Sequence, residues 1–268
     1  MRLKNTAALC AISLLMLSAC QNRFVYFPER DNLEDLSTLA ENAGIEPWTG
    51  GDVVYHGWRY AVAENPANRI VLFHGNAGHA LYRTYFADGF AGIDAGRRWE
   101  VFLFEYPGYG ARDGRLGEES FQRAAWAALE QLLAEDDRPV FLAGESLGSG
   151  IATHLAGRRP DDVAGLFLIT PFTNLADVGA HHVGRLPVAL ILRDRYDNVA
   201  ALRDYRGPVA FLLAGRDEVV PTLLGRELHD KYAGPKHLWI QEDAGHNTLD
   251  HDPANPWWDE VSDFLLNR

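Results

Sequence analysis

Short apolar runs alternate along the chain with stretches in which apolar positions recur at helical spacing. Several of these runs are almost wholly apolar, as expected of parallel strands that are covered on both faces. The predicted strands are 53–60, 70–73, 101–104, 140–143, 166–169, 209–214 and 238–241, and the predicted helices are 81–95, 118–135, 149–159, 222–232 and 257–266. Such alternation predicts an α/β domain with a mostly parallel central sheet and helices on both faces. Its functional loops should gather at the carboxyl ends of the strands.

Two segments depart from this alternation. Residues 172–207 separate two predicted strands by an unusually long stretch, which we interpret as a small lid insertion within a domain covering 52–268. Residues 20–51 precede the first strand and are expected to form a tether that packs against the domain. The aromatic run at 24–28 within this tether is expected to make core contacts rather than to line a ligand site.

The first twenty residues have the layout of a secretory signal. Arg2 and Lys4 precede an apolar stretch at 7–17, and Leu-Ser-Ala-Cys follows at 17–20. These last residues resemble the lipobox of bacterial lipoproteins, which implies that residues 1–19 are a signal peptide and that Cys20 is the lipid attachment site. The alternatives are an ordinary signal peptide cut nearby and an uncleaved apolar anchor. The expected location is the bacterial cell envelope, with a lipid anchor facing the periplasm. Gln21, where an Asp would favour the inner membrane, tilts this expectation to the outer membrane.

Composition limits the chemistry that the domain can use. A net charge of −12 argues against a nucleic-acid partner, because a phosphate backbone requires a basic surface. The two cysteines, Cys10 and Cys20, both lie in the signal region, so the mature domain has no thiol nucleophile and no disulfide. The adjacent His181 and His182 lack the spacing of metal ligands and are assigned to the lid. These residues therefore give no reason to expect a metal site.

The candidate nucleophile is Ser146. It lies in Gly-Glu-Ser-Leu-Gly at 144–148, directly after a predicted strand and before a predicted helix. In this Gly-x-Ser-x-Gly turn, small residues two positions before and after the serine let the chain reverse sharply and expose the hydroxyl. A hydroxyl is a weak nucleophile at neutral pH, so it needs a general base that is itself oriented by a third group.

The base and the acid are predicted from strand ends further along the chain. His246 follows the strand at 238–241 and is the candidate general base. Asp217 follows the strand at 209–214 and is the candidate for orienting that base, with Glu218 and Asp243 as competing acids. For the oxyanion, the backbone N–H groups of Leu147 and of Asn76 are the expected donors, with Ala77 as an alternative to Asn76.

Several motifs occur in order along the chain: His-Gly-Asn-Ala-Gly at 74–78, Glu-Tyr-Pro-Gly-Tyr-Gly at 105–110, the serine motif at 144–148, Gly-Arg-Asp at 215–217 and Gly-His-Asn at 245–247. Together they resemble the α/β-hydrolase superfamily and, more narrowly, its Bem46-like serine hydrolases, over about residues 50–268. The resemblance implies the α/β-hydrolase fold and hydrolysis of acyl bonds without a metal or cofactor. The family commonly has Asp-Tyr-Arg-Gly-Tyr-Gly in the second motif, so Glu105 and Pro107 are departures beside the site.

The sequence thus predicts a serine hydrolase that cleaves carboxylic esters or thioesters through an acyl-enzyme intermediate. A peptidase or amidase of the same fold and a non-catalytic binding lipoprotein that retains the fold are the alternatives. The resemblance implies a small-molecule or acylated substrate, because its characterised members include esterases, thioesterases acting on acylated proteins, and peptidases. The acyl chain length, the leaving group and the oligomeric state are left open.

Overall fold

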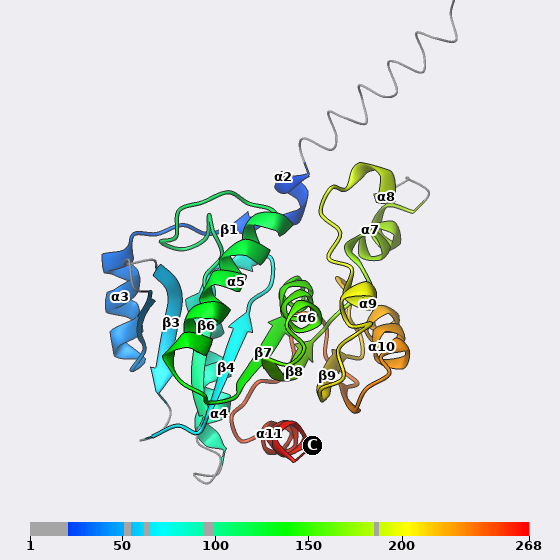
Figure 1. Cartoon of the computed structure of the whole chain (residues 1–268). Coiled ribbons are helices and arrows are strands. Elements are labelled where there is room, and N and C mark those ends of the chain that lie inside the picture. Colours follow the sequence, from blue (N-terminus) through cyan, green and yellow to red (C-terminus); the bar gives the residue numbers. More distant parts are fainter. Residues whose placement is uncertain (1–20, 51–54, 62–64, 94–98, 185–187, 268) are drawn as a thin grey trace, which may run out of the picture.

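A computed structural model describes residues 21–50, 55–61, 65–93, 99–184 and 188–267 (Figure 1). The predicted signal peptide and Cys20 lie outside these residues. An eight-stranded sheet runs through the domain in the order β10-β9-β8-β7-β4-β6-β3-β2. The strands are β2 (Glu46–Thr49), β3 (Tyr55–Ala61), β4 (Asn68–Phe73), β6 (Trp99–Phe104), β7 (Val140–Glu145), β8 (Val163–Ile169), β9 (Val209–Ala214) and β10 (Lys236–Gln241). From β10 to β6 the pairing is parallel, and β3 is antiparallel to both of its neighbours.

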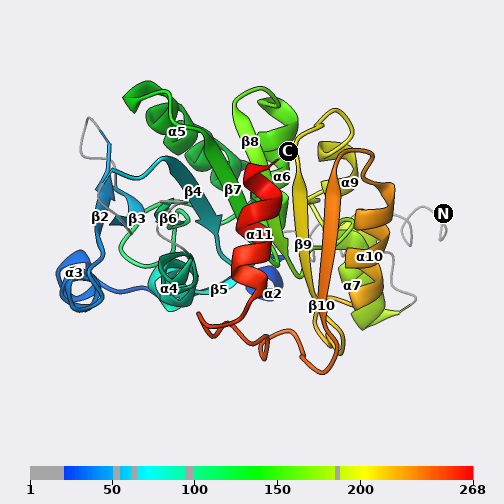
Figure 2. The ribbon, with the colours of Figure 1, turned by 90° about the horizontal axis from the view of Figure 1, so that it is seen from below.

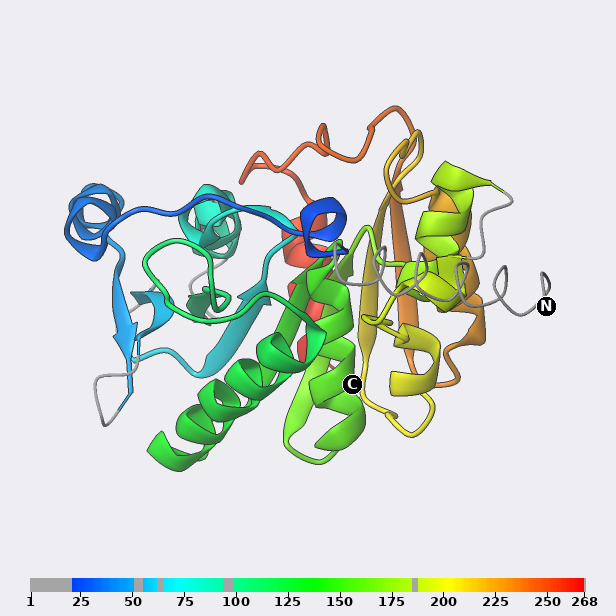
Figure 3. The same cartoon turned by 90° about the horizontal axis from the view of Figure 1, so that it is seen from above.

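Helices cover both faces of the sheet, as Figures 2 and 3 show from below and above. On one face lie α3 (Leu33–Asn42), α4 (Thr84–Gly92) and α11 (Trp257–Leu266), and on the other lie α5 (Glu118–Glu135), α6 (Gly148–Arg158) and α10 (Thr222–Lys231). Strand residues alternate between the two cores. In β4, Ile70 and Leu72 pack under α4 and α11, whereas Val71 and Phe73 pack under α5 and α6. Both faces are buried, which explains why the strands are almost continuously apolar.

The predicted strands are all present with small shifts at their ends, and α5 and α11 have the predicted bounds. The predicted helix at 81–95 is divided into the 3-10 helix η1 (Ala80–Arg83) and α4, and residues 94 and 95 lie outside the described residues. The segment predicted as a tether supplies an edge strand, β2, and the helix α3, neither of which the apolar pattern predicts. The mostly parallel α/β architecture is confirmed.

The segment predicted as a lid contains α7 (Leu175–Val183), α8 (Val188–Ile191) and α9 (Asn198–Ala201). At the same end of the molecule lies α2 (Asn22–Val25), and the following β1 (Phe27–Pro28) pairs in parallel with β5 (Ala77–Gly78) (Figure 1). None of the described helices combines the length and apolar character that crossing a bilayer requires.

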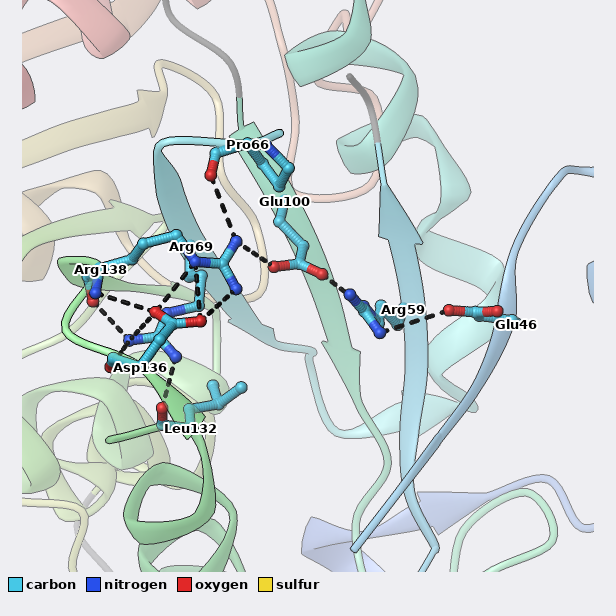
Figure 4. A network of polar contacts seen from close by, with 8 residues as sticks. All are labelled: Glu46, Arg59, Pro66, Arg69, Glu100, Leu132, Asp136 and Arg138. Carbon is cyan, nitrogen blue, oxygen red and sulfur yellow. Dashed lines mark hydrogen bonds and ion pairs between the residues drawn. The ribbon is translucent and has the colours of Figure 1, made fainter. Parts of the chain in front are cut away.

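A polar network ties the amino ends of β4 and β6 to the loop before β7 (Figure 4). The fully buried carboxylate of Glu100 accepts hydrogen bonds from Arg59 and, at 2.7 Å, from Arg138. The equally buried Arg69 donates to the backbone carbonyls of Leu132, Asp136 and Arg138. Burial lowers the pKa of Arg69, although Asp136 opposes that effect. This network lies at the edge of the sheet opposite the carboxyl ends, so its role is to stabilise the fold.

Candidate active site

Ser146 lies on the sharp turn between β7 and α6. Its φ of 52° is in the left-handed region, which is costly for a residue with a side chain. The turn requires small flanking residues, because a Cβ on Gly148 would lie 1.9 Å from the Phe73 carbonyl oxygen. A Cβ on Gly144 would lie 2.5 Å from the Cα of Ser149. The Ser146 N–H donates to the carbonyl of Ile169 at 2.8 Å, which fixes the strained residue to the neighbouring strand.

The three side chains predicted to act together meet at the carboxyl edge of the sheet. His246 Nε2 lies 3.1 Å from Ser146 Oγ, and His246 Nδ1 lies 2.7 Å from Asp217 Oδ2. Asp217 is held in turn, because its Oδ1 accepts from the N–H groups of Val219 and Val220 at 2.9 and 2.7 Å. A carboxylate can only accept, so Nδ1 carries the ring proton and Nε2 is free to accept from the serine hydroxyl. This arrangement can remove a proton from Ser146.

The two competing acids occupy other positions. Glu218 is exposed, and its Oε2 accepts from the backbone N–H of His246 at 3.4 Å rather than from the ring. Asp243 pairs with Arg216 at 2.5 Å, and both side chains are largely in solvent. Of the three acids, Asp217 therefore has the contact that could orient the imidazole.

The loop after β4 lies beside the serine, as the oxyanion prediction requires. A Cβ on Gly75 would lie 3.7 Å from the Cβ of Ser146, and Asn76 lines the same cavity as Ser146 and Leu147. Among the turn and loop hydrogen bonds of the described residues, none uses the N–H of Asn76 or of Leu147 as donor. Ala77, the alternative, lies in β5 opposite Phe27, and its N–H is not a donor in those bonds either. The choice of Asn76 over Ala77 stays a prediction.

The N-terminal segment holds this loop in place. The Asn76 carbonyl accepts from the Phe27 N–H at 2.9 Å and from the Tyr109 hydroxyl at 2.7 Å. The Asn76 side-chain amide donates to the Val25 carbonyl at 2.7 Å. On the other side, buried His74 contacts the Gly75 carbonyl through Nδ1 at 2.7 Å. The loop is thus fixed from both directions.

An ion pair joins the loop to the nucleophile turn. Arg83 donates through Nε to Glu145 at 2.7 Å and through Nη1 to the Ala77 carbonyl at 3.1 Å. Burial alone would raise the pKa of Glu145, but the Arg83 guanidinium outweighs it and holds that pKa below its ordinary value. Since Glu145 directly precedes Ser146, Arg83 sets the position of the turn relative to the predicted oxyanion donors.

An apolar cavity of about 410 Å³ opens beside Ser146. Its walls come from the N-terminal segment, α7, α8 and the loop after β9, and its apolar lining residues include Phe24, Phe27, Phe172, Leu175, Val178, Val183, Val188, Leu192, Val219 and Val220. The expectation of core contacts for the run at 24–28 is right for Val25 and Tyr26, which are buried. It is wrong for Phe24 and Phe27, because α2 and β1 turn these two rings toward the cavity and solvent.

His182 of the lid segment also lines this cavity, and its Nε2 lies 2.7 Å from the Val219 carbonyl. Within the described part of the chain, no three His, Cys, Asp or Glu side chains are grouped as metal ligands. Sequence reasoning missed the roles of Arg83, Tyr109 and Val25. The motif at 105–110 contains Tyr109, but the partner of its hydroxyl depends on the fold.

The fold and the grouping of these side chains define an α/β hydrolase. The chain belongs to the Hydrolase_4 family, described as serine aminopeptidase, S33, whose match spans residues 64–198. An uncharacterized protein of Mycobacterium tuberculosis is 33% identical over 99% of this chain and 97% of its own length. Protein bem46 of Schizosaccharomyces pombe is 26% identical over 80% of this chain and 75% of its own, which confirms the Bem46-like affinity. The esterase Pf2001 of Pyrococcus furiosus shares the fold with a TM-score of 0.65 at 15% identity, covering 91% of this chain and 97% of that one.

Proposed function

We propose that the protein is a serine hydrolase that cleaves carboxylic ester or thioester bonds. The observation that carries this proposal is the 3.1 Å approach of His246 Nε2 to the hydroxyl of Ser146 at the wall of an apolar cavity. Ser146 Oγ would attack the carbonyl carbon while its proton passes to Nε2. The carbonyl oxygen would become an oxyanion between the N–H groups of Asn76 and Leu147.

The reaction would be completed in two further transfers. The tetrahedral intermediate expels the alcohol or thiol, which takes its proton from Nε2 of His246, and the acyl group stays on Ser146. Water then gives a proton to Nε2 and attacks the acyl carbon, and the second tetrahedral intermediate releases the acid while Nε2 returns the proton to Ser146 Oγ. Asp217 stabilises the imidazolium that forms in each step.

The lining of the cavity favours an acyl substrate over a peptide. Nearly all of the described lining residues are apolar, and none carries a carboxylate that could pair with the free amino group of a peptide. An acyl chain gains about 0.8 kcal/mol for each methylene buried in such a surface. A peptidase or amidase is therefore the second candidate, supported by the name of the family rather than by this lining.

The nucleophile is tested with Ser146→Ala and a matched control, Ser37→Ala on α3. With p-nitrophenyl butyrate, Ser146→Ala should lose roughly 10⁶-fold in kcat, and a fluorophosphonate probe should label the parent and Ser37→Ala but not Ser146→Ala. A folded parent that neither turns over the ester nor takes up the probe would instead favour the non-catalytic binding protein. Parallel assays with aminoacyl p-nitroanilides measure aminopeptidase activity and so test the peptidase alternative.

We also propose that Cys20 anchors the protein by a lipid to a membrane of the bacterial cell envelope, on its periplasmic side. The basic start, the apolar stretch at 7–17 and the residues at 17–20 support this location. Metabolic labelling with palmitate should mark the parent chain and not Cys20→Ala. Equal labelling of the two chains would refute Cys20 as the attachment site.

A further inference from the structure

Exposed apolar side chains surround the mouth of the cavity. We define this apolar rim as Phe24, Phe27, Val183, Leu190 and Val219, all of which are large hydrophobic residues exposed to solvent. Four of them also line the cavity, and Leu190 lies on α8 between the lining residues Val188 and Leu192. Phe24 and Leu190 are each 74% exposed. Exposed apolar side chains that gather around one cavity mark a site of interaction with a protein or a membrane.

The start of the described chain is fixed at this rim. The side chain of Gln21 is buried, and its Oε1 accepts from the backbone N–H of Arg193 at 2.7 Å. Five residues later, the Tyr26 hydroxyl bonds to Asp194 and lies 2.9 Å from the Tyr196 hydroxyl. The N-terminal segment is therefore fastened to the stretch that follows α8, and α2 lies at the same end of the molecule as α7 and α8 (Figure 1).

Because of this attachment, only a very short length of chain separates the rim from Cys20, the proposed lipid attachment site. Cys20 is joined directly to Gln21, and neighbouring Cα atoms are about 3.8 Å apart. A lipid on Cys20 would hold the rim at the bilayer surface, and an uncleaved anchor at 7–17 would hold it there almost as closely. Arg23, exposed on α2 beside Phe24, is suited to contact lipid phosphates.

We propose that the apolar rim docks into a phospholipid bilayer, so that an acyl chain can pass from the leaflet into the cavity beside Ser146. The passage of substrate rests on the proposed function, whereas the docking itself does not. A bilayer is favoured over a second copy of the chain because the sequence directs the adjoining residues to a membrane. Phe24 and Leu190 would enter the interface while the cavity mouth faces the acyl chains.

Docking is tested on the full chain reconstituted in phosphatidylethanolamine–phosphatidylglycerol vesicles. Leu190→Cys carries a fluorophore, and the matched control is Leu39→Cys, where the native side chain is 53% exposed; Leu39 belongs to α3, which lies far from α7 and α8 (Figures 1 and 3). Both variants also carry Cys10→Ser. Brominated lipids should quench the label at position 190 and not that at 39, whereas aqueous iodide should do the reverse. Equal access of iodide to both labels, or a dimer whose contact buries position 190, would overturn the proposal.

The passage of substrate is tested with Leu190→Glu and Leu39→Glu. For an ester held in vesicles, Leu190→Glu should lower the rate roughly tenfold, which corresponds to losing the burial of one large apolar side chain. Both variants should hydrolyse a soluble short-chain ester like the parent. An equal loss on soluble and vesicle substrates would refute a docking role for Leu190. Ser146→Ala in the quenching assay separates the two proposals, since it should dock normally even though it cannot turn over.

Discussion

Replacing Asp217 by Asn tests the proposed orientation of the base. In the parent, Oδ2 accepts from Nδ1 of His246 at 2.7 Å while Oδ1 accepts from two backbone N–H groups, those of Val219 and Val220. An amide has one accepting oxygen and one donating nitrogen. If its oxygen meets the two N–H groups, its nitrogen faces Nδ1, and the ring must take the tautomer with the proton on Nε2. In that tautomer His246 cannot accept a proton from Ser146.

The flipped amide is no better, because its nitrogen then opposes two N–H donors that are held by the chain. Leaving such donors unsatisfied costs roughly 1–3 kcal/mol each, so the first orientation should prevail and the wrong tautomer with it. Loss of the correct tautomer in a serine triad lowers kcat by about 10⁴, or roughly 5 kcal/mol in activation free energy. We therefore expect the kcat of Asp217→Asn for p-nitrophenyl butyrate at neutral pH to be lower than that of the parent by about this factor. The melting temperature should change little.

The two neighbouring acids are the matched controls. Asp243→Asn removes an exposed ion pair with Arg216, which is worth at most about 1 kcal/mol, and should leave kcat within about twofold. Glu218→Gln retains an oxygen that can accept from the His246 N–H and should behave similarly. If Asp217→Asn kept kcat within tenfold of the parent, or if a control lost as much as Asp217→Asn, the assignment of the orienting acid would be wrong.

Three further predictions concern stability. Glu100→Gln should lower the free energy of unfolding by roughly 1–3 kcal/mol, because it removes the charge of a buried carboxylate that accepts from the partly exposed Arg59 and Arg138; urea unfolding measures this, and kcat of the folded fraction should be unchanged. Because Arg83 lowers the pKa of Glu145 despite its burial, this carboxylate stabilises the fold above its unfolded pKa of about 4.3. That stability is lost as the pH falls through the lower folded value, so Glu145→Gln should flatten the acid side of a profile of melting temperature against pH. Gly148→Ala places a Cβ 1.9 Å from the Phe73 carbonyl oxygen and should abolish soluble expression or greatly lower the melting temperature; a normal melting temperature would contradict the steric account of the turn.

The sequence was informative wherever the fold buries both faces of an element. All residues of β4, β6 and β9 are buried, and all but Asn68, Arg69 and Glu100 are apolar, so each strand contains a short apolar run. β2 gives no such signal, since Trp48 is its one buried residue and Pro47 interrupts the pattern. The sequence of α3 carries a weak helix signal. The Asn32 side chain accepts from the Asp35 N–H and so caps the start of the helix, and Leu36 and Ala40 are buried one helical turn apart.

The same reasoning separates the predictable from the unpredictable parts of the site. Ser146, Asp217 and His246 each follow a parallel strand, and all such strands end at the same edge, so their meeting follows from the order of the elements. The contact of Val25 with Asn76 joins residues 51 positions apart. It uses a backbone carbonyl, which every residue has, so the residue types do not indicate it. The side to which Phe24 turns depends likewise on how the N-terminal segment is bonded to the stretch at 193–196.

Three different restraints converge on the proposed reaction centre. Steric exclusion at the glycines of 144–148 fixes the nucleophile, and Asp217 fixes the imidazole. The loop at 74–78 is held by Arg83, by the Tyr109 hydroxyl and by the N-terminal segment, which supplies the Phe27 N–H and the Val25 carbonyl. Since one oxyanion donor is worth about 10²–10³ in rate, residues 21–28 are part of the proposed machinery rather than a spacer. With the proposed lipid on Cys20, this joint would place the cavity, the donors and the acyl source together in a single attachment.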